Sequence, residues 1–270
     1  MALPLEDFYE DVIGKAQRGL GFNDAQLLAK SGISREALEQ ARAGVFEETS
    51  ARKLAQTLSL GSDALVACGN KSWHPNLEVL PKGFWQLTTD YKGVMTVNAY
   101  VAQSPSRKEA ILFDTGASAT PVLELLEKEK LSLAALLITH GHGDHIADVD
   151  KIRKETQAPV YAVEKGIPCD CPFQWGEVLE LGGLFIDTHR TTGHADDGTT
   201  FRFDLGSESI AVVGDALFSG SMGGANDRYQ EALECNRKEL FSLSDATWVC
   251  PGHGPVSKVG LERVHNPFFA

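Results

Sequence analysis

The 270-residue sequence predicts an α/β fold preceded by a small all-helical domain. In the first 70 residues, short apolar stretches are separated by capping residues and glycines, which is typical of short helices. From Phe84 onward the period of the apolar residues changes, and strand-like runs alternate with helical patterns. We therefore expect a helical domain at residues 1–70, a linker at residues 71–83 and an α/β domain at residues 84–270.

The composition is that of a folded protein without a membrane segment. Hydrophobic residues make up 43% of the chain and charged residues 23%, which excludes disorder of the whole chain. No apolar run approaches the roughly 20 residues of a membrane helix, and the first residues lack the basic and apolar regions of a signal peptide. We expect a cytoplasmic protein. The five cysteines predict reduced thiols rather than a disulfide framework.

The N-terminal region should contain several short helices with identifiable caps. Asn23 or Asp24 can begin one helix that Gly32 ends, and Ser34 can cap the next over residues 35–43. Two more are expected, one from Thr49 or Ser50 to Leu58 and one that begins at Ser62 or Asp63. The apolar residues expected to form one small core there are Leu28, Ile33, Leu38, Val45, Leu54 and Leu58.

The run Leu27-Leu28-Ala29-Lys30-Ser31-Gly32-Ile33-Ser34-Arg35-Glu36-Ala37-Leu38, with its continuation to Leu60, resembles the helix-turn-helix of Cro-type repressors. The resemblance implies a recognition helix at residues 34–42. That helix carries two basic residues, Arg35 and Arg42, and two acidic ones, Glu36 and Glu39. The whole chain has 25 basic and 37 acidic residues, which gives a net charge of −12. Because DNA affinity depends on neutralising phosphates, we expect a packing or dimerisation module, which could form a homo-oligomer. A DNA-binding regulator with a ligand-sensing metal domain is the alternative.

The α/β region should contain at least nine strands and three helices. The expected helices are residues 121–130, 148–156 and 229–243, with Pro121 at a first-turn position. The expected strands are residues 84–87, 94–101, 110–113, 134–138, 160–163, 178–181, 184–187, 199–203 and 210–213.

Metal-ligating side chains follow the apolar strand at residues 134–138. The loop Thr139-His140-Gly141-His142-Gly143-Asp144-His145 carries three imidazoles and one carboxylate within six positions. Imidazole and carboxylate together suit borderline divalent metals such as zinc, and the glycines allow the tight turns that bring the side chains together. This pattern predicts a metal site.

Three later segments each deliver one further ligand at a turn or strand end. They carry His194 in Thr192-Gly193-His194, Asp215 in Val213-Gly214-Asp215, and His253 in Cys250-Pro251-Gly252-His253-Gly254-Pro255. The remaining histidines, His74, His189 and His265, have no such context, and we expect them to cap or pack.

These motifs in this order resemble those of the metallo-β-lactamase-fold hydrolases, over residues 84–270. The resemblance implies an αβ/βα sandwich of two sheets flanked by helices. It implies a first metal position at His140, His142 and His194, and a second at Asp144, His145 and His253, with Asp215 bridging. It also assigns Asp114, in Phe113-Asp114-Thr115-Gly116, a supporting contact to the ligand loop.

Within that family, the segment Gly214-Asp215-Ala216-Leu217-Phe218-Ser219-Gly220-Ser221 and the ending Asn266-Pro267-Phe268-Phe269 resemble the short glyoxalase II-type thioester hydrolases. Full-length members continue into a helical domain that grips glutathione, whereas 17 residues follow His253 here. We therefore expect a small-molecule acyl thioester as substrate, without strict dependence on glutathione. Two divalent ions are expected as cofactors, with zinc first and iron or manganese as alternatives.

The expected chemistry is attack by a hydroxide that two metal ions share, with Asp144 or Asp215 moving the proton. Two other enzyme classes remain open. An iron-dependent persulfide dioxygenase has a similar fold and uses one iron through the residues matching His140, His194 and Asp215. A related nuclease is disfavoured by the acidic charge and by the lack of a large inserted domain.

Overall fold

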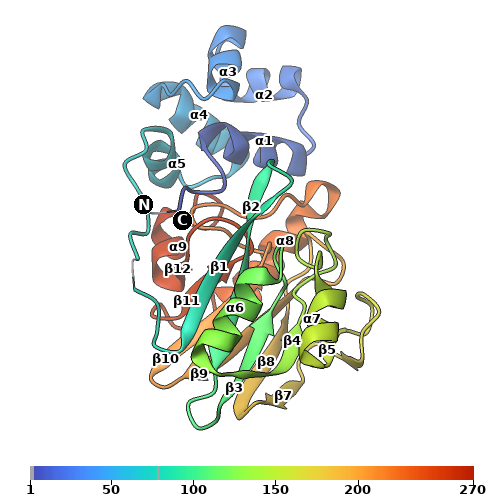
Figure 1. The fold of residues 1–270 in the computed structure, drawn as a ribbon. Helices are drawn as coiled ribbons and strands as arrows, with labels where there is room; N and C mark the ends of the chain where they lie inside the picture. Colours follow the sequence, from blue (N-terminus) through green and yellow to red (C-terminus); the bar gives the residue numbers. More distant parts are fainter. Residues whose placement is uncertain (1–2, 78) are drawn as a thin grey trace.

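The computed structural model describes residues 3–77 and 79–270, and these form five helices followed by a sandwich of two sheets (Figure 1). The helices are α1 (Tyr9–Gly19), α2 (Asp24–Ser31), α3 (Arg35–Arg42), α4 (Glu48–Leu58) and α5 (Ser62–Gly69). None of the helices in the described ranges is long and apolar enough to cross a membrane. All five cysteines are free.

Helices α2 and α3 begin and end where their capping residues predict. Asn23 accepts a hydrogen bond from the Gln26 amide at the start of α2, and Gly32 ends that helix with φ 66°. Ser34 caps α3 through the Ala37 amide. The predicted start of α4 at Thr49 or Ser50 is wrong, because Glu47 caps that helix by accepting from both of their amides, and α5 begins at Ser62 after Gly61 without a side-chain cap. Helix α1 was not predicted, because its N-terminus has no Ser, Thr, Asp or Asn cap.

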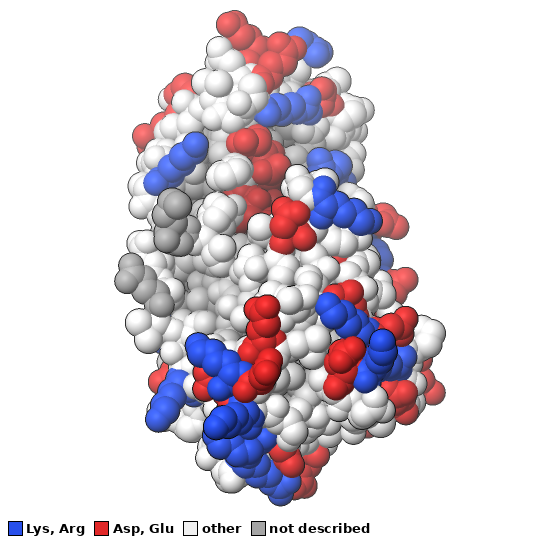
Figure 2. Space-filling view, viewed as in Figure 1, with Lys and Arg blue, Asp and Glu red and all other residues white. Residues whose placement is uncertain are grey.

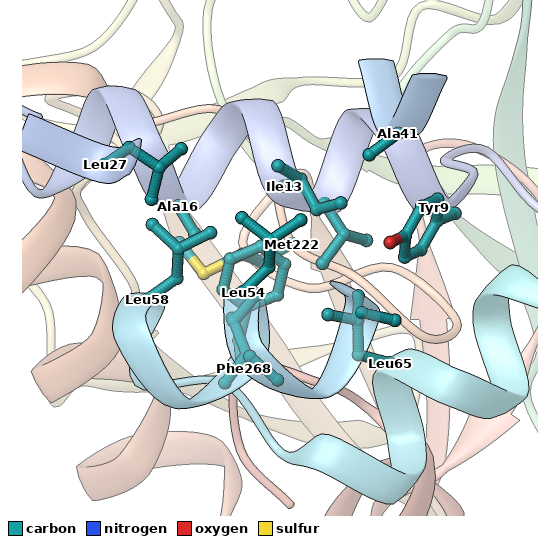
Figure 3. Packing of buried hydrophobic residues seen from close by; sticks show 14 of the residues in the cluster. Tyr9, Ile13, Ala16, Leu27, Ala41, Leu54, Leu58, Leu65, Met222 and Phe268 are labelled. Carbon is teal, nitrogen blue, oxygen red and sulfur yellow. The ribbon is translucent and has the colours of Figure 1, made fainter. Parts of the chain in front are cut away.

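The core of these helices extends beyond the N-terminal region. Leu38, Leu54 and Leu58 are buried as expected, but the prediction for Val45 is wrong: it lies 54% exposed, just after the turn at Gly44. The same cluster includes residues from the far end of the chain, and Figure 3 shows two of them, Met222 and Phe268, among the helix side chains. The other distant members are Ala225, Tyr229, Ala232 and Leu233.

The predicted α/β sandwich is confirmed. The strands of the first sheet, in spatial order, are β1 (Phe84–Tyr91), β2 (Met95–Gln103), β3 (Glu109–Phe113), β4 (Ser132–Leu137), β5 (Val160–Val163) and β6 (Cys171–Phe173). Those of the second are β12 (Ser257–Lys258), β11 (Trp248–Pro251), β10 (Glu208–Gly214), β9 (Thr199–Leu205), β8 (Leu184–Arg190) and β7 (Val178–Leu181). The short strands β6 and β12 were not predicted.

Each sheet is covered on its outer face by helices. Helices α6 (Thr120–Glu129) and α7 (Val149–Thr156) pack on the first sheet. The second sheet is covered by α9 (Val259–His265) and by the region of α8 (Tyr229–Cys235), which continues through a π-helical turn at Asn236–Leu240. Between the sheets lies an apolar core rich in aromatic rings, in which Phe113 and Phe203 stack with centroids 5.2 Å apart.

A buried carboxyl in α9 predicts a pH dependence of stability. Glu262 is fully buried and accepts hydrogen bonds from Ser257 Oγ, Gly220 N and Asn266 Nδ2. Burial raises its pKa to about 7, although the hydrogen bonds act in the opposite direction. Since the folded-state pKa lies above the unfolded value, the stability that this carboxyl contributes is fully present below pH about 4.5 and is lost as the pH rises to about 7, by on the order of 3 kcal/mol.

We expect Glu262→Gln to remove most of that fall, because an amide keeps the side-chain shape without the charge. Unfolding free energies from urea titrations at pH 5 and pH 8 measure the effect. The matched control is Glu124→Gln, on the exposed face of α6. Equal pH slopes for the two variants would show that Glu262 is not the group responsible.

Candidate metal centre

The predicted ligands all follow strands, and the fold brings these strand ends to one edge of the sandwich. The loop with His140 follows β4, and Asp215 and His253 follow the adjacent parallel strands β10 and β11. His194 lies in the turn between β8 and β9. The two sheets meet at this edge through a hydrogen bond from the Thr199 amide to the Thr139 carbonyl, 2.9 Å long.

His140, His142 and His194 form a first group. His142 Nδ1 lies 3.0 Å from His140 Nε2 and 3.0 Å from His194 Nε2. One ring nitrogen from each residue falls within 4.8 Å of the other two. Three imidazoles at this spacing can hold one divalent ion.

Asp144, His145 and His253 form a second group beside the first. Asp144 Oδ2 lies 3.6 Å from His145 Nε2 and 3.2 Å from His253 Nε2. Asp215 stands between the groups: one of its oxygens is 3.3 Å from His145 Nε2, and the other is 3.4 Å from His194 Nε2 and 3.3 Å from His253 Nε2. The structure thus brings together all seven residues that the sequence singled out.

Two polar atoms at the centre of this arrangement fit a cation. His145 Nε2 and Asp215 Oδ1 lie 3.3 Å from each other, and they are two of the five buried side-chain atoms without a hydrogen bond among the described residues. Buried polar atoms ordinarily have partners, and those of structural motifs have them within the protein. A divalent ion between the two groups would satisfy both atoms, and the donor set of imidazoles and carboxylates suits zinc, iron or manganese. The clusters and the fold support a binuclear metal site.

The opposite ring nitrogens of three ligands are fixed by hydrogen bonds. His145 Nδ1 lies 2.8 Å from Asp114 Oδ2, His253 Nδ1 donates to the Thr96 carbonyl at 2.6 Å, and His194 Nδ1 donates to the Gly224 carbonyl at 3.0 Å. Such contacts leave the other nitrogen, Nε2, free to bind a metal. Asp114 occupies the supporting place that the sequence predicted for it, and it adopts φ 56°.

The electrostatics of the second group favour positive charge. Burial opposes protonation of His145, but the carboxylates of Asp215 and Asp114 outweigh it and raise its pKa to about 10. Burial likewise opposes protonation of His253, yet hydrogen bonds to Asp144 and Asp215 raise its pKa to about 11. A metal ion would take the place of these protons.

In the first group, burial has the largest effect on the pKa values of His140 and His194. It lowers the pKa of His140 well below its usual value, and the neighbouring His145 adds to this effect. It also lowers the pKa of His194, against the opposing influence of Asp215. Neutral imidazoles are the form that binds metal.

A cavity of about 540 Å³ opens beside the first group, with His142 and His194 in its wall. Its charged lining residues are Lys165, Asp196, Asp197, Asp227 and Arg228. This is room enough for a small ligand. A larger cavity of about 760 Å³ lies at the opposite edge of the sandwich, near Trp248 and Lys258, away from the clustered ligands.

The three remaining histidines lie outside the cluster, as predicted. His189 Nδ1 is 2.9 Å from Glu239 Oε2, His74 Nε2 is 2.9 Å from the Leu3 carbonyl, and His265 stacks on Trp73 at 5.1 Å. What sequence reasoning missed is the approach of the N-terminal segment to the site. Lys15 Nζ lies 5.1 Å from the centre of the Phe218 ring, which in turn packs against His253.

Comparisons with known proteins agree with this geometry. The family model of the metallo-β-lactamase superfamily matches residues 93–168. The chain is 28% identical over 210 residues to an uncharacterised protein from Mycobacterium bovis, covering 65% of this chain and 94% of the relative. It is 29% identical to a "probable metallo-hydrolase" of Streptococcus pyogenes (59% and 80%) and 27% identical to hydroxyacylglutathione hydrolase GloC of Haemophilus influenzae (60% and 87%).

Solved structures of metallo-β-lactamase-fold proteins superpose on this chain. BLEG-1 B3 metallo-β-lactamase superposes with a TM-score of 0.62 at 27% identity, covering 69% of this chain and 99% of that one. ETHE1 from Myxococcus xanthus gives 0.59 at 27% identity (68% and 83%), and TTHA1623 in a di-iron-bound form gives 0.55 at 27% identity (68% and 99%). The chain has the α/β metallo-β-lactamase fold behind an N-terminal helical segment, and its relatives support a metal-dependent hydrolase.

Proposed function

We propose that this protein hydrolyses a small acyl thioester with two divalent metal ions. The first position is formed by His140, His142 and His194, and the second by Asp144, His145 and His253, with Asp215 shared between them. The observation that carries the proposal is the convergence of both groups on Asp215, where Asp215 Oδ1 and His145 Nε2 are buried 3.3 Å apart without a hydrogen bond. Zinc is the proposed metal.

When bound, the two ions would lower the pKa of a shared water toward about 7 and polarise the substrate carbonyl. A carboxylate of the protein would accept the proton that this water releases. The side chains of Asp144 and Asp215 are 14% and 7% exposed, so Asp144 is the more accessible proton acceptor of the two. In the net reaction, water adds to the acyl carbon and the carbon–sulfur bond breaks, and the thiolate leaves without needing a proton donor.

The cavity favours a small substrate over a glutathione conjugate. Arg228 pairs with Asp196 and with Glu231, and Asp197 accepts a hydrogen bond from the Gly141 amide. Of the two basic residues that line the cavity in the described part of the chain, Arg228 forms ion pairs and Lys165 forms none. One free cation in an acid-rich lining offers little to the two carboxylates of a glutathione moiety.

We also propose that the N-terminal helices do not bind DNA. Figure 2 shows acidic and basic side chains interspersed over them on the face in view. Arg42 pairs with Asp24, and Arg52 pairs with both Glu48 and Asp63, so these cations are already neutralised. A homo-oligomer through this region and a cytoplasmic location remain predictions.

A substrate panel on zinc-loaded and iron-loaded protein tests the proposed reaction. We expect the zinc form to hydrolyse simple acyl thioesters, and to show a high KM for S-lactoylglutathione because little binding energy is available for its thiol half. Oxygen uptake with glutathione persulfide is measured in parallel. Oxygen uptake by the iron form, with no thioester cleavage by either form, would contradict the hydrolase and favour the dioxygenase alternative.

A further inference from the structure

We propose that the N-terminal helical segment positions the metal ligands, and that Lys15 and Asp7 are the residues through which it acts. They hold the loop at residues 221–224, and this loop contacts His194 and Asp215 directly. The inference rests on the proposed function only in treating those two residues as metal ligands.

Lys15 and Asp7 bind the loop through a nearly buried ion pair. Their side chains are 15% and 10% exposed, and they pair with each other. Lys15 Nζ also donates to the Met222 carbonyl at 2.8 Å, and Ser221 Oγ donates to Asp7 Oδ2 at 2.5 Å. The Met222 side chain is 1% exposed in the core of the N-terminal helices (Figure 3). The segment therefore holds the loop by side chain and backbone together.

The next two residues of the loop contact the metal centre. The Gly223 amide donates to the Asp215 carbonyl at 3.1 Å, and the Gly224 carbonyl accepts from His194 Nδ1 at 3.0 Å. The approach is close enough that a Cβ on Gly223 would lie 2.8 Å from His194 Nδ1. A shift of Met222 would therefore move the groups that orient both ligands.

A second path reaches His194 from its other side. At the end of α1, Gly19 lies directly against the ring of Tyr229, the first residue of α8. One turn along α8, Ala232 packs on Gly193, where a Cβ would lie 2.5 Å from the Ala232 Cβ. Gly193 adopts φ 131° and immediately precedes His194. The residues on both sides of this imidazole thus depend on α1.

The physical reason for such an arrangement is the flexibility of the loop. Two consecutive glycines cost more conformational entropy to order than other residues do. A ligand supported by an unanchored glycine loop would sample many orientations, whereas contacts behind the ligand hold its geometry. The ion pair and the buried Met222 side chain provide that anchor.

The test compares Lys15→Met with Lys53→Met, which changes an exposed lysine of α4 in the same way. Zinc affinity is measured by competition with a chromophoric chelator. We expect Lys15→Met to weaken zinc binding by about 10–100-fold, the usual effect of losing a residue that orients a ligand. Lys15→Arg should recover part of the loss, and Lys53→Met should match the unchanged protein.

A second readout does not need a metal. In metal-free protein labelled with 15N, the ring signals of His194 should shift in Lys15→Met, while those of His189, which pairs with Glu239, stay in place. If Lys15→Met does not fold, Ser221→Ala removes only the hydroxyl bound to Asp7 and should show the same two effects in smaller measure. A variant that loses thermal stability but keeps both its zinc affinity and its His194 signals would overturn the proposal.

These readouts separate the positioning role from the reaction. If the protein binds zinc and hydrolyses no thioester, the proposed function fails while the zinc titration still decides the role of Lys15. If it binds no zinc, the His194 signals of the metal-free protein decide it alone.

Discussion

Replacing Asp215 with alanine is expected to weaken metal binding at both positions, by more than about 100-fold, and to abolish hydrolysis with it. Asp215 is the residue whose carboxylate approaches His194 of one group and both His145 and His253 of the other. Its removal would also take from His145 Nε2 the carboxylate oxygen that lies 3.3 Å away, and would leave Asp144 Oδ2, at 3.6 Å, as the carboxylate beside that nitrogen. That loss exceeds the 10–100-fold typical of a residue that only orients a ligand.

His253→Ala should behave differently. It removes one member of the second group and leaves His140, His142 and His194 intact, so we expect about one ion to remain. Metal content after dialysis, together with a zinc titration, distinguishes the two variants. His189→Ala is the control, because His189 pairs with Glu239 outside the cluster. A wild-type protein that holds one ion at saturation would contradict the binuclear arrangement.

Gly252→Ala is expected to damage the same site through sterics alone. A Cβ at this position would overlap Asp215 Oδ1 and would lie 2.5 Å from His145 Cε1. Neither side chain can move away easily, because His145 is hydrogen-bonded to Asp114 and Asp215 is buried. We expect loss of the second metal ion and at least a 100-fold fall in kcat/KM, since small displacements of reacting groups have effects of this order.

The control for this substitution is Gly14→Ala in α1. There a Cβ meets only the far end of the Arg18 side chain, which can move, and alanine favours a helix. Metal content and kcat/KM are measured for both variants. Normal metal content in Gly252→Ala would show that the site tolerates displacement of Asp215, against the geometry described here.

The candidate site could be predicted because each ligand is signalled locally. His140 to His145 lie in one glycine-containing loop, and Asp215 and His253 each follow an apolar strand. The strands showed where each ligand follows an apolar run, but the grouping of the ligands into two metal positions came from the resemblance to the metallo-β-lactamase-fold hydrolases. The strands β6 and β12 escaped prediction because runs of three and two residues carry no periodicity.

Other features had an incomplete local signal or none. Helix α1 has the apolar spacing of Tyr9, Val12, Ile13 and Ala16, but its N-cap is Phe8, and the Phe8 amide is instead satisfied by the Asp11 carboxylate. The hydrogen bond from Lys15 to the Met222 carbonyl joins positions 207 residues apart, and no sequence pattern near either residue predicts it. Tertiary packing alone determines such contacts.

The shared core described above also bears on how this chain could have acquired its helical segment. Met222, Tyr229 and Phe268 are at most 4% exposed, and they pack in one apolar cluster with the N-terminal helices. An ancestor without those helices would have presented these apolar side chains to water. Replacing the helices by an unrelated module would therefore require a matching change in residues 222–233 and 268.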